Sequence, residues 1–485
     1  MHRTGSGGVK KLVQRTVDIL QSADVDYGEV RAELIRTENT DFRNARLDDC
    51  RTVETQGVGI RVLVNGSWGF AACTGLERDD IEAAAARAVE IAGAAGGRGK
   101  VELAPLDIQQ GVYTGPCRKD PFEVPREDKI ALLQQVSDDM MKDPRIKSSQ
   151  ARLWFEKRNR VIGTTRGDLI ETDLIFTQPD VMATAVAGGD AQSRSMQDGA
   201  RIAGWEWIEQ SGIASWGEKA REEALMKVLA DESPSGRMDL LLDGLHLSLT
   251  MHESVGHPTE SDRALGWEAN MAGRTFVKLS DQGSLRYGSS LVNFLADNTL
   301  PYGVATWGWD DDLVPGQKWY TVKNGIFQEF GSVRETALLI GKQASRGCCR
   351  AMDTQCFPIN RQPNFYLEPP DNGVTPEELA SDIDHGIWIE GRGSFSIDQR
   401  RENFQFGGDL FWEIKNGKKT RPLKKVIYRS RTPEFWSSLD GIADRKFFRT
   451  MGLLTCGKGE PGQSARMTHG ASYCRFRGIE VGGGR

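Results

Sequence analysis

A short polar segment at residues 231–237, Asp-Glu-Ser-Pro-Ser-Gly-Arg, divides this chain into two parts whose sequence patterns differ. Its Pro, Gly and Ser content is typical of a linker, so we expect a domain boundary there. The boundary predicts one domain over residues 1–233 and a second over residues 234–485. With 485 residues, the chain is long enough for each domain to bury a core of its own.

The first part combines helical and strand-like patterns. Apolar residues follow mostly helical spacing over residues 10–23, 78–94, 128–141 and 218–229. Alternating, strand-like segments lie between these helices, and Asn65-Gly66 predicts a tight hairpin between two of them. These patterns predict an α+β domain in which helices pack on a mostly antiparallel sheet.

The second part has short strand-like runs separated by many turns. Two further Asn-Gly pairs, at residues 324–325 and 416–417, predict hairpins. One short helix is indicated where Thr375 and Glu378 can form a capping box. The second domain is therefore expected to be mainly β, which gives the whole chain an α+β fold class.

Composition excludes several classes of function. Lys plus Arg number 62 against 68 for Asp plus Glu, so the net charge is −6 and no broad basic surface is expected to bind nucleic acid. No run of about 18 apolar residues occurs, and the charged, Gly-rich start lacks the apolar stretch of an export signal. The sequence thus predicts no membrane span. Its eight cysteines are expected to be reduced thiols of a cytoplasmic protein.

The segment Gly-Leu-His-Leu-Ser-Leu-Thr-Met-His-Glu-Ser-Val-Gly-His at residues 244–257 is the main candidate for chemistry. It is apolar on most faces, as a buried helix would be, and Asp243 is expected to cap it. Near its end stand His252, Glu253 and His257. This is the composition of a zinc-protease helix, with one residue more between the histidines than in the HExxH motif.

The extra residue requires a deformed helix. Histidines five positions apart lie about 140° apart on a regular α-helix and could not share one metal ion. We expect Gly256 to permit unusual torsions and Pro258 to move His257 out of the α region. The helix can then widen or stop, and His257 can turn back toward His252. Two histidines that are paired by chance remain the alternative.

Cys456 is the best candidate for a third ligand, because a turn-rich segment follows it and a thiolate binds zinc strongly. A buried reduced thiol is the alternative role. His469 is a reserve ligand, or the base of a thiol protease built on Cys456. The same turn spells GxGxxG at residues 457–462, but too few residues follow it for a dinucleotide-binding unit.

Several segments together resemble the TldD/PmbA family of metallopeptidases, in particular its zinc-binding, TldD-like subunits. They are the segment HESVGHPTESD at 252–262, the hairpin LFWEIKNGKK, the segments CGKGEPGQ and IEVGGG near the end, and QGVGIRVLVNGSWGFAA at 56–72. The resemblance covers nearly the whole chain. The metal motif combined with the cysteine loop is specific, since the related PmbA-like subunits lack the HExxxH ligands.

The resemblance implies a zinc-dependent peptidase that hydrolyses unfolded or extended peptides. Zinc would be held by His252, His257 and Cys456, and Glu253 would be the general base for the water that the zinc binds. Glu260 and Asp262 are close enough in sequence to orient the metal-bound imidazoles, although a role in a solvated loop is equally open.

Other candidate residues receive structural roles. His385 is expected at the end of the capped helix rather than at a metal. Cys348, Cys349 and Cys356 have no CxxC spacing and are taken as structural thiols. The sequence assigns none of these residues to the metal centre.

A different class of function remains open beside the peptidase. Members of the family have also been described as modulators of DNA gyrase, so a non-catalytic scaffold or regulatory partner with a structural metal is the alternative. A fourth protein ligand such as His469 would favour a structural zinc. The resemblance further implies a homodimer, or a heterodimer with a PmbA-like subunit. Its partners would be peptide substrates, with no nucleic acid and no membrane.

Overall fold

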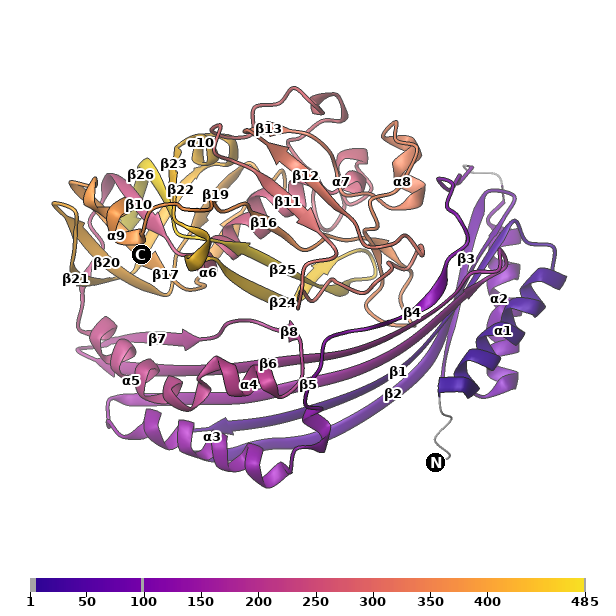
Figure 1. Cartoon of the computed structure of the whole chain (residues 1–485), viewed down its shortest axis with the longest axis horizontal. Coiled ribbons are helices and arrows are strands. Elements are labelled where there is room, and N and C mark those ends of the chain that lie inside the picture. The colour runs from indigo at the N-terminus through magenta and orange to yellow at the C-terminus, as the bar shows by residue number, and fades with distance from the viewer. Residues whose placement is uncertain (1–5, 97–99, 484–485) are drawn as a thin grey trace.

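The computed structural model describes residues 6–96 and 100–483 of the chain (Figure 1). Part of the charged, Gly-rich start that carried the expectation of no export signal, residues 1–5, lies outside the described residues. Within the described ranges, no helix is both long enough and apolar enough to cross a membrane.

The first unit consists of helices around one large sheet. Its helices are α1 (Ser6–Ser22), α2 (Arg78–Ala94), α3 (Arg126–Met141), α4 (Glu206–Ser211) and α5 (Trp216–Val228). Its strands are β1 (Tyr27–Arg43), β2 (Arg46–Val64), β3 (Ser67–Thr74), β4 (Gln110–Thr114), β5 (Ile146–Thr164), β6 (Leu169–Ala187), β7 (Asp190–Met196) and β8 (Arg201–Ile202).

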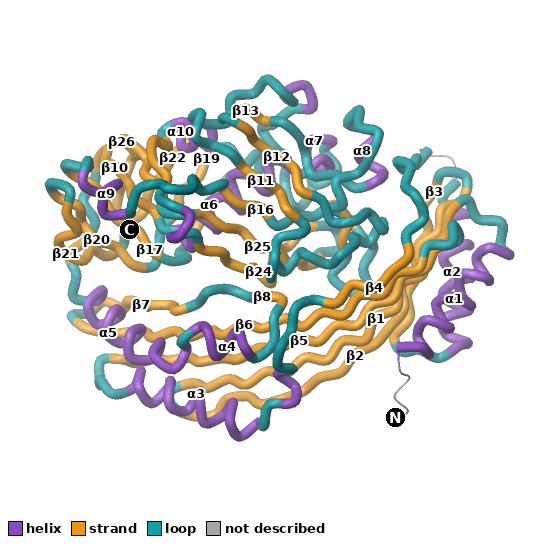
Figure 2. Tube along the Cα trace, viewed as in Figure 1, coloured by secondary structure: helices purple, strands orange, loops and turns teal. Residues whose placement is uncertain are grey.

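The strands of this sheet follow the order β3-β2-β1-β5-β6-β4, and β7 and β8 also pair with β6. Every pairing except β4 with β6 is antiparallel, as expected from the sequence. The long strands curve beneath the second part of the chain (Figures 1 and 2). Separate apolar clusters join α1 and α2 to one end of the sheet and α3 and α5 to the other.

The second unit contains short helices and many short strands. Its helices are α6 (Gly244–Met251), α7 (Ser261–Leu265), α8 (Arg334–Leu339), α9 (Pro376–Ser381) and α10 (Thr432–Ser437). Its strands are β9 (Asp231–Glu232), β10 (Gly236–Leu242), β11 (Phe294–Asp297), β12 (Lys318–Lys323), β13 (Ile326–Phe327), β14 (Cys349–Arg350), β15 (Ile359–Asn360), β16 (Phe365–Leu367), β17 (His385–Glu390), β18 (Phe395–Ile397), β19 (Asn403–Phe406), β20 (Leu410–Lys415), β21 (Lys418–Lys424), β22 (Val426–Arg431), β23 (Leu439–Ile442), β24 (Arg449–Lys458), β25 (Gln463–Ala471) and β26 (Cys474–Gly483).

Two larger sheets form this unit. One follows the order β18-β19-β22-β26-β10-β17-β20-β21-β9, with β23 paired to β26, and the other follows β13-β12-β11-β16-β25-β24. A single apolar core combines side chains from both sheets with Leu247, Leu249 and Met251 of α6. Helix α6 therefore lies inside the unit, where its apolar faces are buried. The metal-motif residues that follow it are consequently held by the core.

The local sequence signals are borne out. The four helices predicted in the first part correspond to α1, α2, α3 and α5, and the three Asn-Gly pairs form hairpins in which both residues have positive φ. Thr375 and Glu378 form the predicted capping box of α9. The predicted linker differs in part, because residues 231–232 already pair with β21 as β9 and β10 begins at Gly236.

Candidate metal centre

The helix that follows β10 changes its winding where the two histidines stand. The Asp243 carboxylate caps α6 by accepting the His246 N–H at 2.7 Å. Beyond α6 the helix widens into one π turn over His252–Gly256, in which the His257 N–H donates to the His252 carbonyl five residues earlier. The wider turn brings both imidazoles to the same side, which a regular α-helix would not allow.

The expected cause of this deformation is wrong in detail. Gly256 (φ −58°, ψ −56°) and His257 (φ −64°, ψ −43°) both keep right-handed helical torsions, so neither Gly256 nor Pro258 moves the chain out of the α region. Gly256 is required for space instead. A Cβ at this position would lie 1.9 Å from the Gln362 side-chain oxygen and 2.8 Å from a ring carbon of Phe365.

The side chains of His252, His257 and Cys456 converge, with one possible ligand atom from each lying within 4.8 Å of the other two. Cys456 Sγ is 3.6 Å from His257 Nε2, and all three residues are buried. Cys456 comes from β24, where the pairing with β25 shifts register between Leu453 and Cys456. The cysteine that the sequence singled out thus lies beside both histidines.

The protonation states of the three groups suit metal binding. Burial lowers the pKa of His252 and of His257 to about 4, so both imidazoles are neutral near pH 7. Burial by itself raises the pKa of the Cys456 thiol, whereas His257 in its protonated form and the Arg361 guanidinium lower it, and together they leave it below the ordinary value. Two neutral imidazoles and an acidified thiol form a donor set that zinc prefers.

Glu260 supports the ring of His257. The Glu260 carboxylate lies 2.9 Å from His257 Nδ1 and also accepts from Arg263 at 2.7 Å and from Lys458 at 3.0 Å. Burial raises the pKa of the Glu260 carboxyl, but Lys458 and Arg263 hold it well below its usual range. Asp262 pairs with Lys458 at 2.7 Å and so acts one contact further from the metal centre.

His469 lies next to His252 but outside the three-residue cluster. Its Nε2 is 2.8 Å from His252 Nδ1. Among the described residues, the imidazole that contacts the Cys456 thiol is that of His257. The geometry therefore favours neither the reserve-ligand role nor the thiol-protease role that the sequence left open for His469.

Glu253 carries a partner that no sequence pattern indicated. Its buried carboxylate accepts through Oε2 from Arg401 Nη1, an ion pair between positions 148 residues apart. Arg401 stands in the turn between β18 and β19 with φ of +62°. Lys458 was also missed, although strand alternation from Cys456 could have placed it on the same face of β24.

The remaining candidate residues of the sequence analysis lie outside the three-residue cluster. His385 opens β17 rather than ending α9, and its ring contacts Glu413 at 3.3 Å. Gly457, Gly459 and Gly462 belong to the hairpin between β24 and β25, so they do not precede a helix as a dinucleotide fingerprint would. All eight cysteines, including Cys348, Cys349 and Cys356, are free thiols in the described part of the chain.

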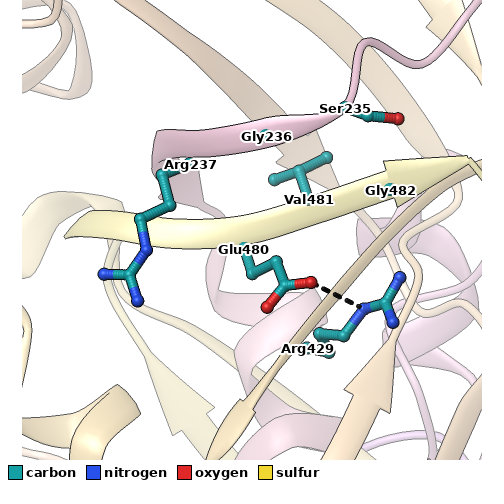
Figure 3. Close-up of a pocket in the computed structure, with 7 residues that line it drawn as sticks. All are labelled: Ser235, Gly236, Arg237, Arg429, Glu480, Val481 and Gly482. Carbon is teal, nitrogen blue, oxygen red and sulfur yellow. Dashed lines mark ion pairs between the residues drawn. The ribbon is translucent and has the colours of Figure 1, made fainter.

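A surface pocket of about 420 Å³ lies apart from the three-residue cluster (Figure 3). It is lined by Ser235, Gly236, Arg237, Arg429, Glu480, Val481 and Gly482. The Arg429–Glu480 ion pair, at 3.5 Å, crosses it. None of these residues belongs to the cluster or contacts its ligand atoms.

Three domain descriptions match this sequence and together cover most of it. They are "PmbA/TldA metallopeptidase domain 1" over residues 28–92, the "central domain" over 119–228 and the "C-terminal domain" over 235–483. A protein named "Metalloprotease" from Methanothermobacter thermautotrophicus is 27% identical over 460 residues, covering 95% of this chain and 96% of that protein. A "Metalloprotease TldD homolog" from Buchnera aphidicola is 22% identical over 475 residues, covering 96% of this chain and 94% of that protein.

Solved structures share the fold at lower sequence identity. TldE from Thermococcus kodakarensis superimposes with a TM-score of 0.74 at 14% identity, covering 97% of this chain and all of that one. A candidate modulator of a DNA gyrase from Thermotoga maritima gives a TM-score of 0.76 at 16% identity, covering 98% of this chain and all of that one. At these identities the likeness establishes the α+β fold.

Proposed function

This chain belongs to the PmbA/TldA metallopeptidase family, and we propose that it is a zinc-dependent peptidase that hydrolyses extended or unfolded peptides. His252, His257 and Cys456 would hold the zinc, and Glu253 would be the general base. The observation that carries the proposal is the buried convergence of these three donors beside a buried carboxylate.

The donor chemistry fits zinc. A thiolate and two neutral imidazoles leave one of the four usual zinc positions free, as in catalytic rather than structural sites. When bound, zinc would supply Lewis-acid chemistry, polarising a peptide carbonyl and acidifying water. His469 contacts His252 through the Nδ1 side of that ring, so it supports a ligand and does not fill the fourth position.

Glu253 is placed to move a proton. Arg401 engages Oε2, and no hydrogen bond among the described residues uses Oε1. The free oxygen can take a proton from the attacking water and pass it to the leaving amine. Arg401 meanwhile fixes the carboxylate in one orientation, and the ion pair compensates for its burial.

The position of Cys456 supports an extended substrate. Cys456 lies on β24, the last strand of its sheet. Gly452 of this strand already pairs with residues 199–200, and the Cys456 carbonyl accepts from Arg361, so a substrate would use the other edge groups of β24. A peptide in extended form can add to such an edge through main-chain hydrogen bonds, a mode that tolerates many side chains. Folded proteins would first have to open locally to present their backbone.

We further propose that the protein works in the cytoplasm as a homodimer or with a PmbA-like subunit. Eight free thiols suit a reducing compartment. The fold shared with TldE supports a paired assembly. A net charge of −6 gives no support for nucleic acid as a partner.

Metal analysis coupled to peptide cleavage tests the proposal. We expect about one zinc per chain and cleavage of an unstructured peptide. A chelator should abolish the cleavage, and added zinc should restore it. A chain that holds zinc but cleaves no peptide, alone or with a PmbA-like subunit, would instead indicate the scaffold or gyrase-modulator role.

Substrate form is tested separately with one small protein, assayed folded and as a destabilised variant of nearly the same sequence. We expect the destabilised form to be cleaved at least about tenfold faster, because its backbone is open in a larger fraction of molecules. Cleavage of an unstructured peptide of matched sequence controls for site preference. Equal rates for the two protein forms would contradict the requirement for an extended backbone.

A further inference from the structure

We propose that His469 is a positioning residue that orients the imidazole of His252 for metal binding. The inference rests on the metal centre of the proposed function. His469 is fully buried, and its Nε2 lies 2.8 Å from His252 Nδ1. Its position in the chain, 217 residues from His252, means that only the tertiary fold creates this contact.

The hydrogen bond determines which nitrogen of His252 faces the metal. With Nδ1 engaged by His469, the ring has Nε2 left to offer a lone pair. A neutral imidazole that binds metal through Nε2 carries its proton on Nδ1, and that proton is then donated to His469 Nε2. His469 thus selects the tautomer and the ring orientation that a ligand needs.

This arrangement leaves a cost on His469 itself. Since its Nε2 accepts, its own proton must sit on Nδ1, a buried atom that makes no well-formed hydrogen bond among the described residues, although a backbone group of Phe365 lies near the ring. A buried polar group without a partner is unfavourable. Orienting a metal ligand would offset the cost of burying His469 Nδ1.

The surroundings hold the His469 ring rigidly. Its centroid lies 4.1 Å from that of Phe365, which pairs with His469 across β16 and β25. The His469 carbonyl accepts from Ser248 of α6 at 3.2 Å, so strand β25 is fastened to the helix that leads into the metal motif. A small displacement of β25 would therefore shift the His252 ring as well.

The two histidine ligands consequently receive unlike support. His257 contacts the Glu260 carboxylate, which also accepts from Arg263 and Lys458. His252 contacts the imidazole of His469 instead, with His469 Nε2 2.8 Å from His252 Nδ1.

Cobalt(II) affinity, measured by competition with a chelator, tests the role without relying on turnover. We expect His469→Leu to bind cobalt about 10- to 100-fold more weakly than the unaltered chain, the usual effect of losing a group that orients a ligand. His469→Gln should recover most of the affinity, because its amide oxygen can accept the His252 proton. His469→Met replaces the leucine variant if that variant does not fold.

His246→Leu is the matched control. His246 is equally buried and lies on α6, but it contacts Tyr428 and the Gly391 carbonyl instead of the cluster. We expect it to lower the melting temperature of the metal-free protein and leave cobalt affinity unchanged. Unchanged affinity in His469→Leu, or no recovery in His469→Gln, would overturn the positioning role alone. Failure of the unaltered chain to bind cobalt or zinc would overturn the metal centre as well.

Discussion

The surroundings of Glu253 determine which of its two carboxylate oxygens can accept a proton. A buried carboxylate without a partner is costly, and Arg401 removes that cost by pairing with one oxygen. The pairing leaves the other oxygen available among the described residues. Arg401 therefore stabilises the buried charge through Oε2, while Oε1 of the same Glu253 carboxylate remains able to accept a proton.

Replacement of the carboxylate by an amide separates metal binding from proton transfer. We expect Glu253→Gln to retain about one zinc per chain, because Glu253 is outside the donor cluster, and to lose about 10²- to 10⁴-fold in kcat. Metal analysis and peptide cleavage on the same preparation measure both. Glu434→Gln, at an exposed carboxylate paired with Arg431, is the control and should be unaffected. Retained turnover in Glu253→Gln would argue against the general-base role.

The π turn after α6 is the element on which the centre depends. It places His252 and His257 together by shifting one hydrogen bond to five-residue spacing. The turn is held from outside as well, since Gln362 donates to the His252 carbonyl at 3.2 Å. Gly256 allows Gln362 to approach this closely.

A methyl group at Gly256 should therefore disturb the centre. We expect Gly256→Ala to lower the free energy of unfolding by about 1–3 kcal/mol through overpacking and to weaken zinc binding. Thermal unfolding of the metal-free protein and a zinc titration measure the two effects. Gly462→Ala is the matched control, because a Cβ there meets nothing within 4 Å. Equal behaviour of the two variants would mean that the close contact with Gln362 is unimportant.

Across the whole molecule, buried ion pairs join the long sheet to the unit that contains the candidate metal centre. Asp311 accepts from Arg31 of β1 at 3.0 Å, pairs with Arg160 of β5 and accepts the Ala351 N–H at 2.7 Å. Both arginines are almost fully buried. The curved sheet, which lies beneath the second unit (Figure 1), is thus fixed to it by charge as well as by apolar packing.

Removal of Asp311 should loosen this junction. We expect Asp311→Ala to cost about 3–5 kcal/mol, because it leaves two buried guanidinium groups without their carboxylate. Asp48→Ala removes an exposed carboxylate from β2 of the same sheet and should cost less than about 1 kcal/mol. Denaturant unfolding of the three proteins provides the comparison. A similarly small effect of both substitutions would contradict a stabilising role for the buried pairs.

The assembly state is a further property of the whole molecule. We expect light scattering on the protein expressed alone to give a mass near twice 53.7 kDa, in line with the proposed dimer. Peptide cleavage by the same sample shows whether that assembly is complete. A monomer without activity would point to a missing PmbA-like subunit, whereas a fully active 53.7 kDa monomer would contradict the dimer.

Signals carried by neighbouring residues were sufficient for much of the fold. The helices around Leu20, Ala88 and Leu133, the Asn-Gly hairpins and the Asp243 cap all follow from contacts within a few residues. The three donors of the candidate metal centre could be singled out because His252 and His257 share one segment and a glycine-rich turn follows Cys456. Their separation by an extra residue also required a deformed helix, which the π turn supplies.

The sequence by itself therefore determined the longer helices, the hairpins, the α+β class and the candidate ligands, since these depend on spacing along the chain. Only the tertiary structure decided how the ligands are supported. It brought His469 to His252 and Arg401 to Glu253 across 217 and 148 residues, and it placed Glu260 rather than Asp262 against His257. Such contacts depend on how β25 and the β18–β19 turn pack around α6, and spacing in a single sequence carries no record of packing between distant segments.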